Sequence, residues 1–188
     1  GLTWNLVQNL LTNSFANHVY FSNGKIIMST GQGLYESLNS GATWQANNTG
    51  ITGLQITSFG ANSNYVFAGT DNQGVFRSSD DGLNWQPTNV GINTLNSFHV
   101  SSIIIVNEDI YLGTGNGVYK SKNNGNSWDF IFNPGLNTST YALDYNNGVL
   151  VTGASDKGIY ISKDFGLTWT LTSTVGITIE TSYKSIEI

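Results

Sequence analysis

All five tryptophans of the chain recur at intervals of 40 to 43 residues, at Trp4, Trp44, Trp85, Trp128 and Trp169. The last four each close the same eight-residue motif, which reads SLNSGATW from Ser37, SSDDGLNW from Ser78, SKNNGNSW from Ser121 and SKDFGLTW from Ser162. The chain opens on GLTW, the tail of a further copy. A fixed period of this length indicates one supersecondary unit copied in tandem, and it limits the possible folds more than any other feature.

Four short strands are predicted in each repeat. An aliphatic strand A comes first, followed by an apolar strand B and a Gly-rich turn. Strand C then runs from a glycine to the serine that opens the motif, and strand D carries the tryptophan. Runs of β-branched and aromatic residues bounded by Gly and Asn are typical of strands, and no window has the apolar spacing of a helix. Four antiparallel strands about every 41 residues predict an all-β fold, a β-propeller with four full blades and a partial one.

The repeat also predicts where the blades lie. The full blades are expected at residues 15–47, 54–88, 97–130 and 140–172, and the partial blade combines a strand D at 1–8 with a strand A at 177–188. A ring closed from these residues alone would leave strand edges unpaired, and such edges invite association. We therefore expect a segment of a longer propeller. The alternative is a unit whose missing strands come from a second copy.

Each conserved position of the motif has a predicted structural role. The Asp or Asn turns its side chain back onto nearby backbone N–H groups, the glycine suits a backbone angle that a side chain opposes, and the tryptophan packs between sheets. The residues concerned are Ser37, Asn39, Gly41 and Trp44, Ser78, Asp80, Gly82 and Trp85, Ser121, Asn123, Gly125 and Trp128, and Ser162, Asp164, Gly166 and Trp169.

The motif resembles the Asp-box, Ser-x-Asp-x-Gly-x-Thr-Trp, also called the bacterial neuraminidase repeat. Asp164 to Trp169 matches it fully, Asn84 replaces its Thr in the second copy, and Asn39 and Asn123 replace its Asp in the first and third. Asp-box proteins include sialidases, xyloglucanases, sortilin-type receptors and a photosystem II assembly factor. The Asn-rich texture is most similar to tandem-repeat surface proteins of Bacteroidetes-like bacteria.

The resemblance implies a structural role for the motif and no active site there, since fold alone does not fix function. In such propellers ligands meet the face that carries the D-to-A connectors and the B-to-C turns. A sialidase would need three arginines, and this chain has only Arg77. A xyloglucanase-like site would need two carboxylates across a cleft. Asp71 and Asp156 lie in B-to-C turns and Asp144 in strand A, so these three are the candidate catalytic residues. Turn geometry alone explains the two turn residues, and we assign no catalytic residue.

No cofactor or metal is predicted. His18 and His99 lack a third ligand at zinc spacing. Glu108 and Asp109 form an acidic turn that is interpreted as solvated rather than as a calcium site. The chain has no cysteine and therefore no disulfide framework.

The composition of the chain limits the classes of partner that it can bind. A net charge of −5 with only seven basic residues excludes a nucleic-acid partner, and no apolar run is long enough to span a membrane. The 10% charged fraction, with 24 asparagines, is typical of a secreted or cell-surface protein. Our first hypothesis is a non-catalytic extracellular propeller that binds a protein or glycan or acts as a scaffold. The alternative is a fragment of an Asp-box glycoside hydrolase, xyloglucanase-like rather than sialidase; an assembly-factor role would require a basic patch that the sequence lacks.

Overall fold

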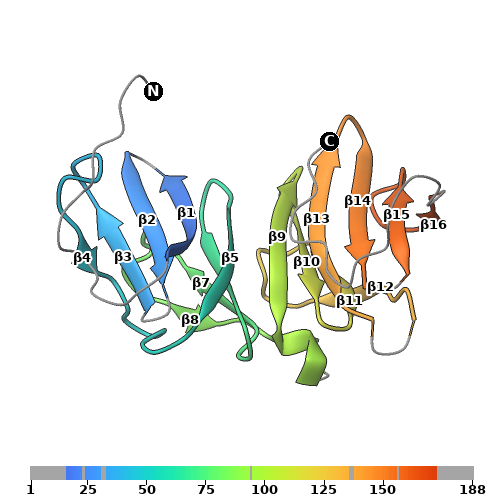
Figure 1. The fold of residues 1–188 in the computed structure, drawn as a ribbon, viewed down its shortest axis with the longest axis horizontal. Helices are drawn as coiled ribbons and strands as arrows, with labels where there is room; N and C mark the ends of the chain where they lie inside the picture. The colour runs from blue at the N-terminus through green and yellow to red at the C-terminus, as the bar shows by residue number, and fades with distance from the viewer. Residues whose placement is uncertain are drawn as a thin grey trace.

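The described part of the chain forms four antiparallel sheets, each of four strands in sequence order. The computed structural model describes residues 16–22, 24–30, 33–93, 95–135, 138–155 and 157–172. We call the sheets blades 1 to 4 in chain order (Figure 1). The predicted partial blade at 1–8 and 177–188, the first tryptophan Trp4 and the candidate Asp156 all lie outside the described residues.

The strands follow the repeat. Blade 1 contains β1 (Ala16–Ser22), β2 (Lys25–Thr30), β3 (Gly33–Ser37) and β4 (Gln45–Ala46). Blade 2 contains β5 (Ile56–Ala61), β6 (Val66–Thr70), β7 (Val75–Ser78) and β8 (Gln86–Pro87). Blade 3 contains β9 (Val100–Val106), β10 (Asp109–Thr114), β11 (Gly117–Ser121) and β12 (Asp129–Phe132). Blade 4 contains β13 (Thr140–Asn146), β14 (Val149–Ala154), β15 (Gly158–Ser162) and β16 (Thr170–Leu171).

Two details differ from the sequence expectation. Each fourth strand begins just after the tryptophan rather than including it, because the indole closes the turn that precedes the strand. A short 3₁₀ helix, η1 (Leu95–Phe98), lies in the connector before β9, although no window of the sequence has helical spacing. Its Ser97 is fully buried, and its hydroxyl lies 2.9 Å from the Tyr119 hydroxyl, so a local polar contact anchors the helix.

The blades stand side by side, with their first strands as neighbours. β5 lies between β1 and β9, and β9 in turn contacts β13, so the order along the chain is also the order in space (Figure 1). The middle strands are the most buried: all five residues of β6 and all five of β11 are buried. Buried strands on both faces are expected where sheets stack face to face around an axis.

Three apolar clusters fill the spaces between consecutive blades. Trp85 lies with Ile27 and Leu34 of blade 1, and Trp128 lies with Phe67 and Val75 of blade 2. Trp169 packs against the cluster between blades 3 and 4. The indoles of Trp85 and Trp128 are almost fully buried, whereas Trp44 and Trp169 are half-buried. An indole buries a large apolar area, so these contacts supply much of the driving force for stacking the blades.

The strand register shows which residues of blades 3 and 4 are equivalent. Leu150 pairs with Ser162 in the same way that Ile110 pairs with Ser121. The apolar run of blade 4 therefore aligns from Leu150 and not from Val149. Leu150 and Ile110 are both fully buried, which is consistent with their equivalence.

A tight turn after each of the first two complete motifs joins one blade to the next. In blade 1 the N–H of Ile51 donates to the carbonyl of Asn48 at 3.0 Å, and Gly50 has a φ of 91°. A Cβ added at Gly50 would lie 2.1 Å from the carbonyl oxygen of Trp85 in the next blade. Gly91 repeats this arrangement with a φ of 94° and a Cβ position 2.1 Å from the carbonyl oxygen of Trp128. Both glycines are thus required by backbone angle and by close approach.

We expect Gly91→Ala to lower the free energy of unfolding by about 3 kcal/mol or more, because the clash is with backbone atoms that cannot move aside. Gly53→Ala is the matched control: Gly53 has a φ of 75° but nothing within 4 Å of an added Cβ. That control should lose only about 1–2 kcal/mol, the cost of a side chain at this backbone angle. Urea unfolding followed by tryptophan fluorescence measures both. Equal losses in the two variants would contradict the close-approach argument.

Candidate functional site

The serine of the motif is a buried hydrogen-bond centre in every described copy. Its hydroxyl accepts the N–H of the motif glycine at 2.8 to 2.9 Å and donates to the Asp or Asn side chain at 2.7 to 3.0 Å. The four serines are each 1% exposed. A buried hydroxyl needs such partners, because an unsatisfied one costs free energy. The serine therefore fixes the turn from the inside, a contact that the sequence pattern alone did not specify.

Asp and Asn perform the same task at the next conserved position. The side-chain oxygen accepts the backbone N–H four residues later in all four copies, at 2.8 to 2.9 Å. The second side-chain atom then pairs with the side chain at that later position. Asn39 donates to the Thr43 hydroxyl, whereas Asp164 accepts from the Thr168 hydroxyl at 2.6 Å. A hydroxyl both donates and accepts, so it serves either partner.

Hydrogen bonds lower the pKa of the two motif aspartates. The Thr168 side chain, together with the Thr168 backbone N–H and Ser162, lowers the pKa of Asp164 from its ordinary value of 3.8 to about 2. The Asn84 side chain and backbone N–H lower the pKa of Asp80 in the same way. Because the folded pKa lies below the unfolded one, the ionised side chain of Asp164 stabilises the fold fully above about pH 5, and this contribution is lost as the pH falls toward 2.

Asp164→Asn tests this linkage. The variant should fold, since Asn39 and Asn123 occupy the same position, and it should be less stable than the parent chain at pH 7. The difference should shrink as the pH falls from about 4 to about 2, where the parent loses its charge. Thermal unfolding at a series of pH values measures it. Asp129→Asn, a change at an exposed carboxylate of β12, is the control, and a pH-independent difference for Asp164→Asn would contradict the linkage.

The residue before the motif glycine has a left-handed backbone in every described copy. Ser40, Asp81, Asn124 and Phe165 all have a φ of 56°. Few residues other than glycine adopt this conformation, and Asn and Asp do so most readily. The conformation turns three of these four carbonyl groups toward a cation of the preceding blade, as the next contacts show.

A cation from each of blades 1 to 3 reaches the left-handed carbonyl of the next blade. Lys25 lies 3.4 Å from the Asp81 oxygen, Lys120 lies 3.4 Å from the Phe165 oxygen, and Arg77 donates to the Asn124 oxygen. The accompanying groups differ. Lys25 lies 3.7 Å from Glu36, Arg77 stacks on the Tyr65 ring with 4.5 Å to its centroid, and Lys120 lies 2.8 Å from Asp109.

These cations occupy one of two neighbouring positions in each blade. The first position directly precedes the residue that pairs with the motif serine, and the second directly precedes the motif serine itself. Blade 1 has Lys25 and Glu36, and blade 3 has the reverse order, Asp109 and Lys120. In blade 4 the register places Val149 and Ile161 there, and neither is charged. The position in strand C is Glu36 in blade 1, Arg77 in blade 2 and Lys120 in blade 3. The swap of charge between two strands hid the pattern, because neither position alone keeps one residue type.

Lys120 is held between two blades by several groups. Burial alone would lower the pKa of its ammonium, but hydrogen bonds with Asp109 and Tyr111 outweigh that effect and raise the pKa. The Tyr111 hydroxyl also donates to the Phe165 carbonyl at 3.1 Å, and burial raises the pKa of this phenol. Lys120 therefore stays charged at neutral pH, as its contact with a carboxylate and a carbonyl requires.

Lys120→Met should lower the free energy of unfolding by about 2 kcal/mol, because it leaves Asp109 and the Phe165 carbonyl without their cation. Lys122→Met, at an exposed lysine two residues away, should change it by less than about 0.5 kcal/mol. The double variant Asp109→Lys/Lys120→Glu recreates the arrangement of blade 1 and should recover part of the loss. Urea unfolding measures all three. A double variant no more stable than Lys120→Met would contradict the equivalence of the two positions.

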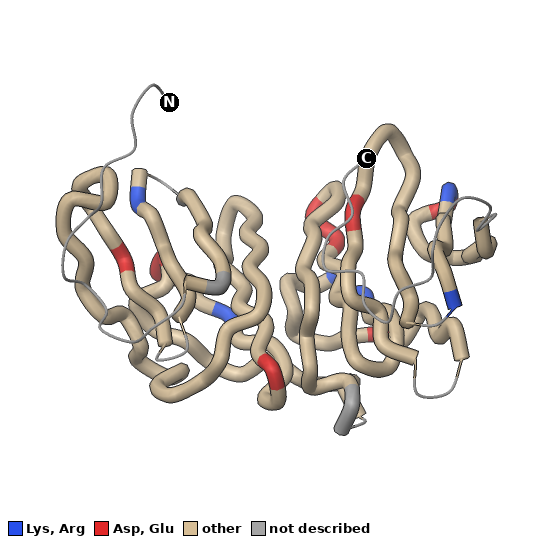
Figure 2. Tube along the Cα trace, viewed as in Figure 1, with Lys and Arg blue, Asp and Glu red and all other residues tan. Residues whose placement is uncertain are grey.

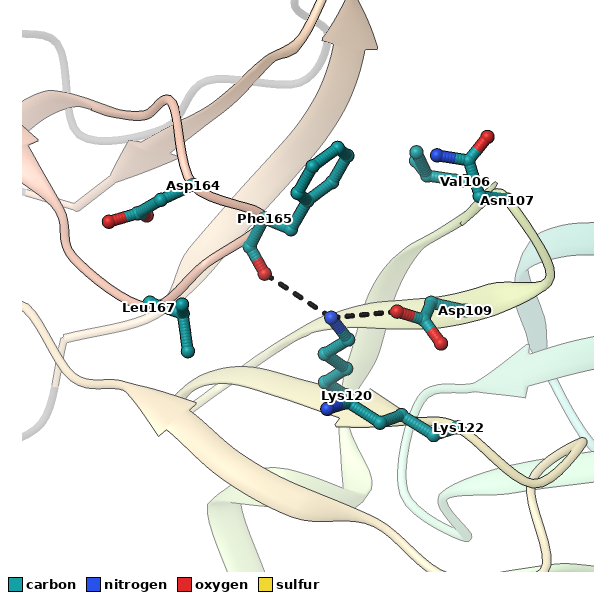
Figure 3. A pocket seen from close by; sticks show the side chains of 8 residues that line it. All are labelled: Val106, Asn107, Asp109, Lys120, Lys122, Asp164, Phe165 and Leu167. Atoms are coloured by element: carbon teal, nitrogen blue, oxygen red, sulfur yellow. Dashed lines mark hydrogen bonds and ion pairs between the residues drawn. The ribbon is translucent and has the colours of Figure 1, made fainter.

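A hollow of about 350 Å³ lies beside this contact, between blades 3 and 4 (Figure 3). Blade 3 lines it with the end of β9, the turn that follows, the start of β10, the strand β11 and one residue of its motif. Blade 4 lines it with its motif. The lining residues are Val106, Asn107, Asp109, Lys120, Lys122, Asp164, Phe165 and Leu167. The hollow is on the face that carries the motifs, opposite the face where the resemblance led us to expect a ligand.

On the connector face, the structure joins two residues that sequence analysis considered separately. The His99 Nδ1 lies 2.7 Å from the Asp71 Oδ1, which links the B-to-C turn of blade 2 to the start of blade 3. Both side chains remain substantially exposed, so this pair contributes little to stability. The Asp71 carboxylate is therefore held by the His99 imidazole.

The other candidate residues lie elsewhere. Asp144 is in β13 and its carboxylate accepts the Tyr145 N–H at 2.8 Å. The backbone N–H groups of Asp71 and Ser155 make equivalent bonds to the preceding connectors, so Ser155 is the counterpart of Asp71 in blade 4. Neither Asp71 nor Asp144 lines the hollow. His18 lies in blade 1 and His99 before blade 3, and within the described residues no group of three potential metal ligands gathers.

Charged residues are sparse over the traced chain (Figure 2). Near the β9–β10 turn, Asp109 lies 2.8 Å from Lys120, and both residues line the hollow together with Lys122. One of the two acidic residues that we interpreted as solvated is therefore paired with a cation. Among the described residues, no helix has the length and apolar character needed to cross a membrane.

Comparison with known proteins identifies the fold. No protein-family model matches the sequence, and no curated protein matches it either. Solved structures do. The extracellular domain of a protein from B. thetaiotaomicron described as a one-component system is 16% identical with a TM-score of 0.77, and the match covers 98% of this chain and 26% of that one. An ancestral GH74 enzyme is 24% identical with a TM-score of 0.76, and the match covers 93% of this chain and 27% of that one.

A third similar structure, YCF48 bound to a D1 peptide, is 17% identical with a TM-score of 0.69, and the match covers 98% of this chain and 62% of that one. This chain thus spans about a quarter of the length of the first two structures. At these identities the likeness concerns the fold alone. Together with the four antiparallel sheets, it shows that the chain has an all-β, propeller fold.

Proposed function

We propose that this chain is a non-catalytic, Asp-box propeller module that binds a protein or a glycan outside the cell. The repeated motif supports the Asp-box assignment, since serine, Asp or Asn, glycine and tryptophan make the same turn contacts in copy after copy. The low charge and high asparagine content support an extracellular setting. The similar domain from B. thetaiotaomicron is itself described as extracellular, which favours the same setting.

The observation that carries the non-catalytic proposal is the position of the candidate acids. Asp71 is hydrogen-bonded to His99 on one face, and Asp144 is in β13, bonded to the backbone of its neighbour. An inverting hydrolase needs two carboxylates about 6.5–9.5 Å apart, facing each other across a sugar. A binding module needs only a surface with suitable polar and apolar groups.

The second candidate is a fragment of a glycoside hydrolase, xyloglucanase-like rather than sialidase. The likeness to a GH74 enzyme favours it, and this chain covers only part of that enzyme's length. In this case Asp71 supplies one carboxylate and the remainder of a longer protein supplies the other. The same comparison supports our proposal that blades 1 to 4 belong to a longer propeller. A natural protein of only 188 residues would contradict that part.

The test uses the longer natural protein that contains blades 1 to 4, because only that protein would hold both carboxylates of a hydrolase. Binding is measured on a glycan array, and released reducing sugar is measured on xyloglucan and on a mixed-linkage glucan. We expect retention on the array or by a protein ligand, with no product above that of a heat-denatured control. Asp71→Asn, which removes the carboxylate of the His99 pair, should leave binding unchanged. Product formation that Asp71→Asn abolishes would contradict the binding-module proposal and support the hydrolase.

A further inference from the structure

We infer that the hollow between blades 3 and 4 is a glycan subsite, in which one sugar ring lies against Phe165. This inference rests on the proposed binding function and narrows it to one ligand class and one place. The site is on the motif face, away from the connectors and from Asp71.

The first observation is that Phe165 is a bulky aromatic residue at a motif position where the other blades have a small polar residue. Its φ of 56° is shared with Ser40, Asp81 and Asn124, but those three are small and polar. A bulky aromatic residue in the left-handed region is strained. The ring stacks on Tyr145, with 6.2 Å between the ring centroids, but Phe165 is still 41% exposed, so this contact leaves part of the ring open to solvent. An exposed ring held in a strained position at the edge of a hollow points to a role in contact with a ligand.

The second observation is that Phe165 is not the only apolar residue at the hollow. Leu167 is 83% exposed and lines the hollow together with Val106 and Phe165 (Figure 3). The motif of blade 3 has Asn124 and Asn126 at the positions of Phe165 and Leu167. The apolar pair is therefore specific to blade 4, and the repeat does not require it. Apolar side chains of this kind match the C–H face of a pyranose ring.

The third observation is the set of polar groups that lines the same hollow. Asp109 uses one carboxylate oxygen for Lys120, at 2.8 Å, and the other can accept a hydrogen bond. Lys122 and the Asn107 amide supply donors at the same hollow. Sugar hydroxyls donate and accept, so they suit a site that offers both.

The charges of the hollow select a neutral ligand. Two aspartates, Asp109 and Asp164, balance two lysines, Lys120 and Lys122. A nucleic acid or polyanion would meet no net positive charge here. A volume of about 350 Å³ is at the lower end of the range for small-ligand pockets, which fits one or two sugar rings. A stable protein partner would have to cover a far wider surface than this hollow.

The test uses isothermal titration of the whole chain with cellotetraose and with a xyloglucan heptasaccharide, alongside an acidic peptide. Phe165→Asn and Leu167→Asn each introduce the residue that the blade 3 motif already has. Asn tolerates the left-handed backbone, so Phe165→Asn keeps the turn. We expect each variant to weaken saccharide binding by about tenfold or more, because the aromatic and apolar contacts are lost. Thermal unfolding should show that both variants stay folded.

Leu83→Asn is the control, because Leu83 is exposed at the position of Leu167 in the blade 2 motif and lies outside the hollow. It should bind like the parent chain. Saccharide binding that Phe165→Asn and Leu167→Asn leave unchanged overturns the subsite and leaves the proposed binding function standing. Binding of the acidic peptide alone, lost in Phe165→Asn, overturns the assignment to sugars. A parent chain that binds neither saccharide also overturns it, and an empty glycan array would then remove the glycan half of the proposed function.

Discussion

The interaction on which the structure depends is the contact between the motif of one blade and the strands of the blade before it. A blade of four short strands cannot bury both of its faces alone, and repeat proteins solve this by stacking neighbours. Here Trp85 and Trp128 enter the preceding apolar cluster, while a left-handed carbonyl at the same turn receives a cation from that preceding blade. The motif therefore connects two blades, and we call it a joint for that reason. The serine and the Asp or Asn fix the shape of the turn, and the indole and the left-handed carbonyl hold the turn against the preceding blade.

This joint explains why the motif tolerates some changes and not others. Asn39 replaces Asp without losing the turn, since its oxygen still accepts the Thr43 N–H. The indole is similarly adaptable. Trp85 donates to its own motif glycine, whereas Trp128 donates to the Thr88 carbonyl of the preceding blade. The glycine has no such freedom, because it combines a left-handed angle with a position against the indole.

The sequence predicted the fold class and the strand order because tryptophan spacing and glycine positions reflect backbone requirements that every blade shares. It missed the cations, since Lys25, Arg77 and Lys120 come from two different strand positions and only their shared target unites them. It also missed the hollow. Phe165 and Leu167 occupy positions that the motif leaves variable, so their meaning emerges only when Val106 and Asp109 of blade 3 lie beside them. Residues that act within one repeat are readable from the chain, and those that act between repeats need the geometry.

The exchange of Asp for Asn divides the blades into two chemical kinds. Blades 1 and 3 close their turns with a neutral amide, and blades 2 and 4 close theirs with a carboxylate. In an array where each repeat contacts only its neighbours, local stability is set repeat by repeat. Strong acid would therefore destabilise blades 2 and 4 first. Local unfolding would then begin inside the array as well as at its ends.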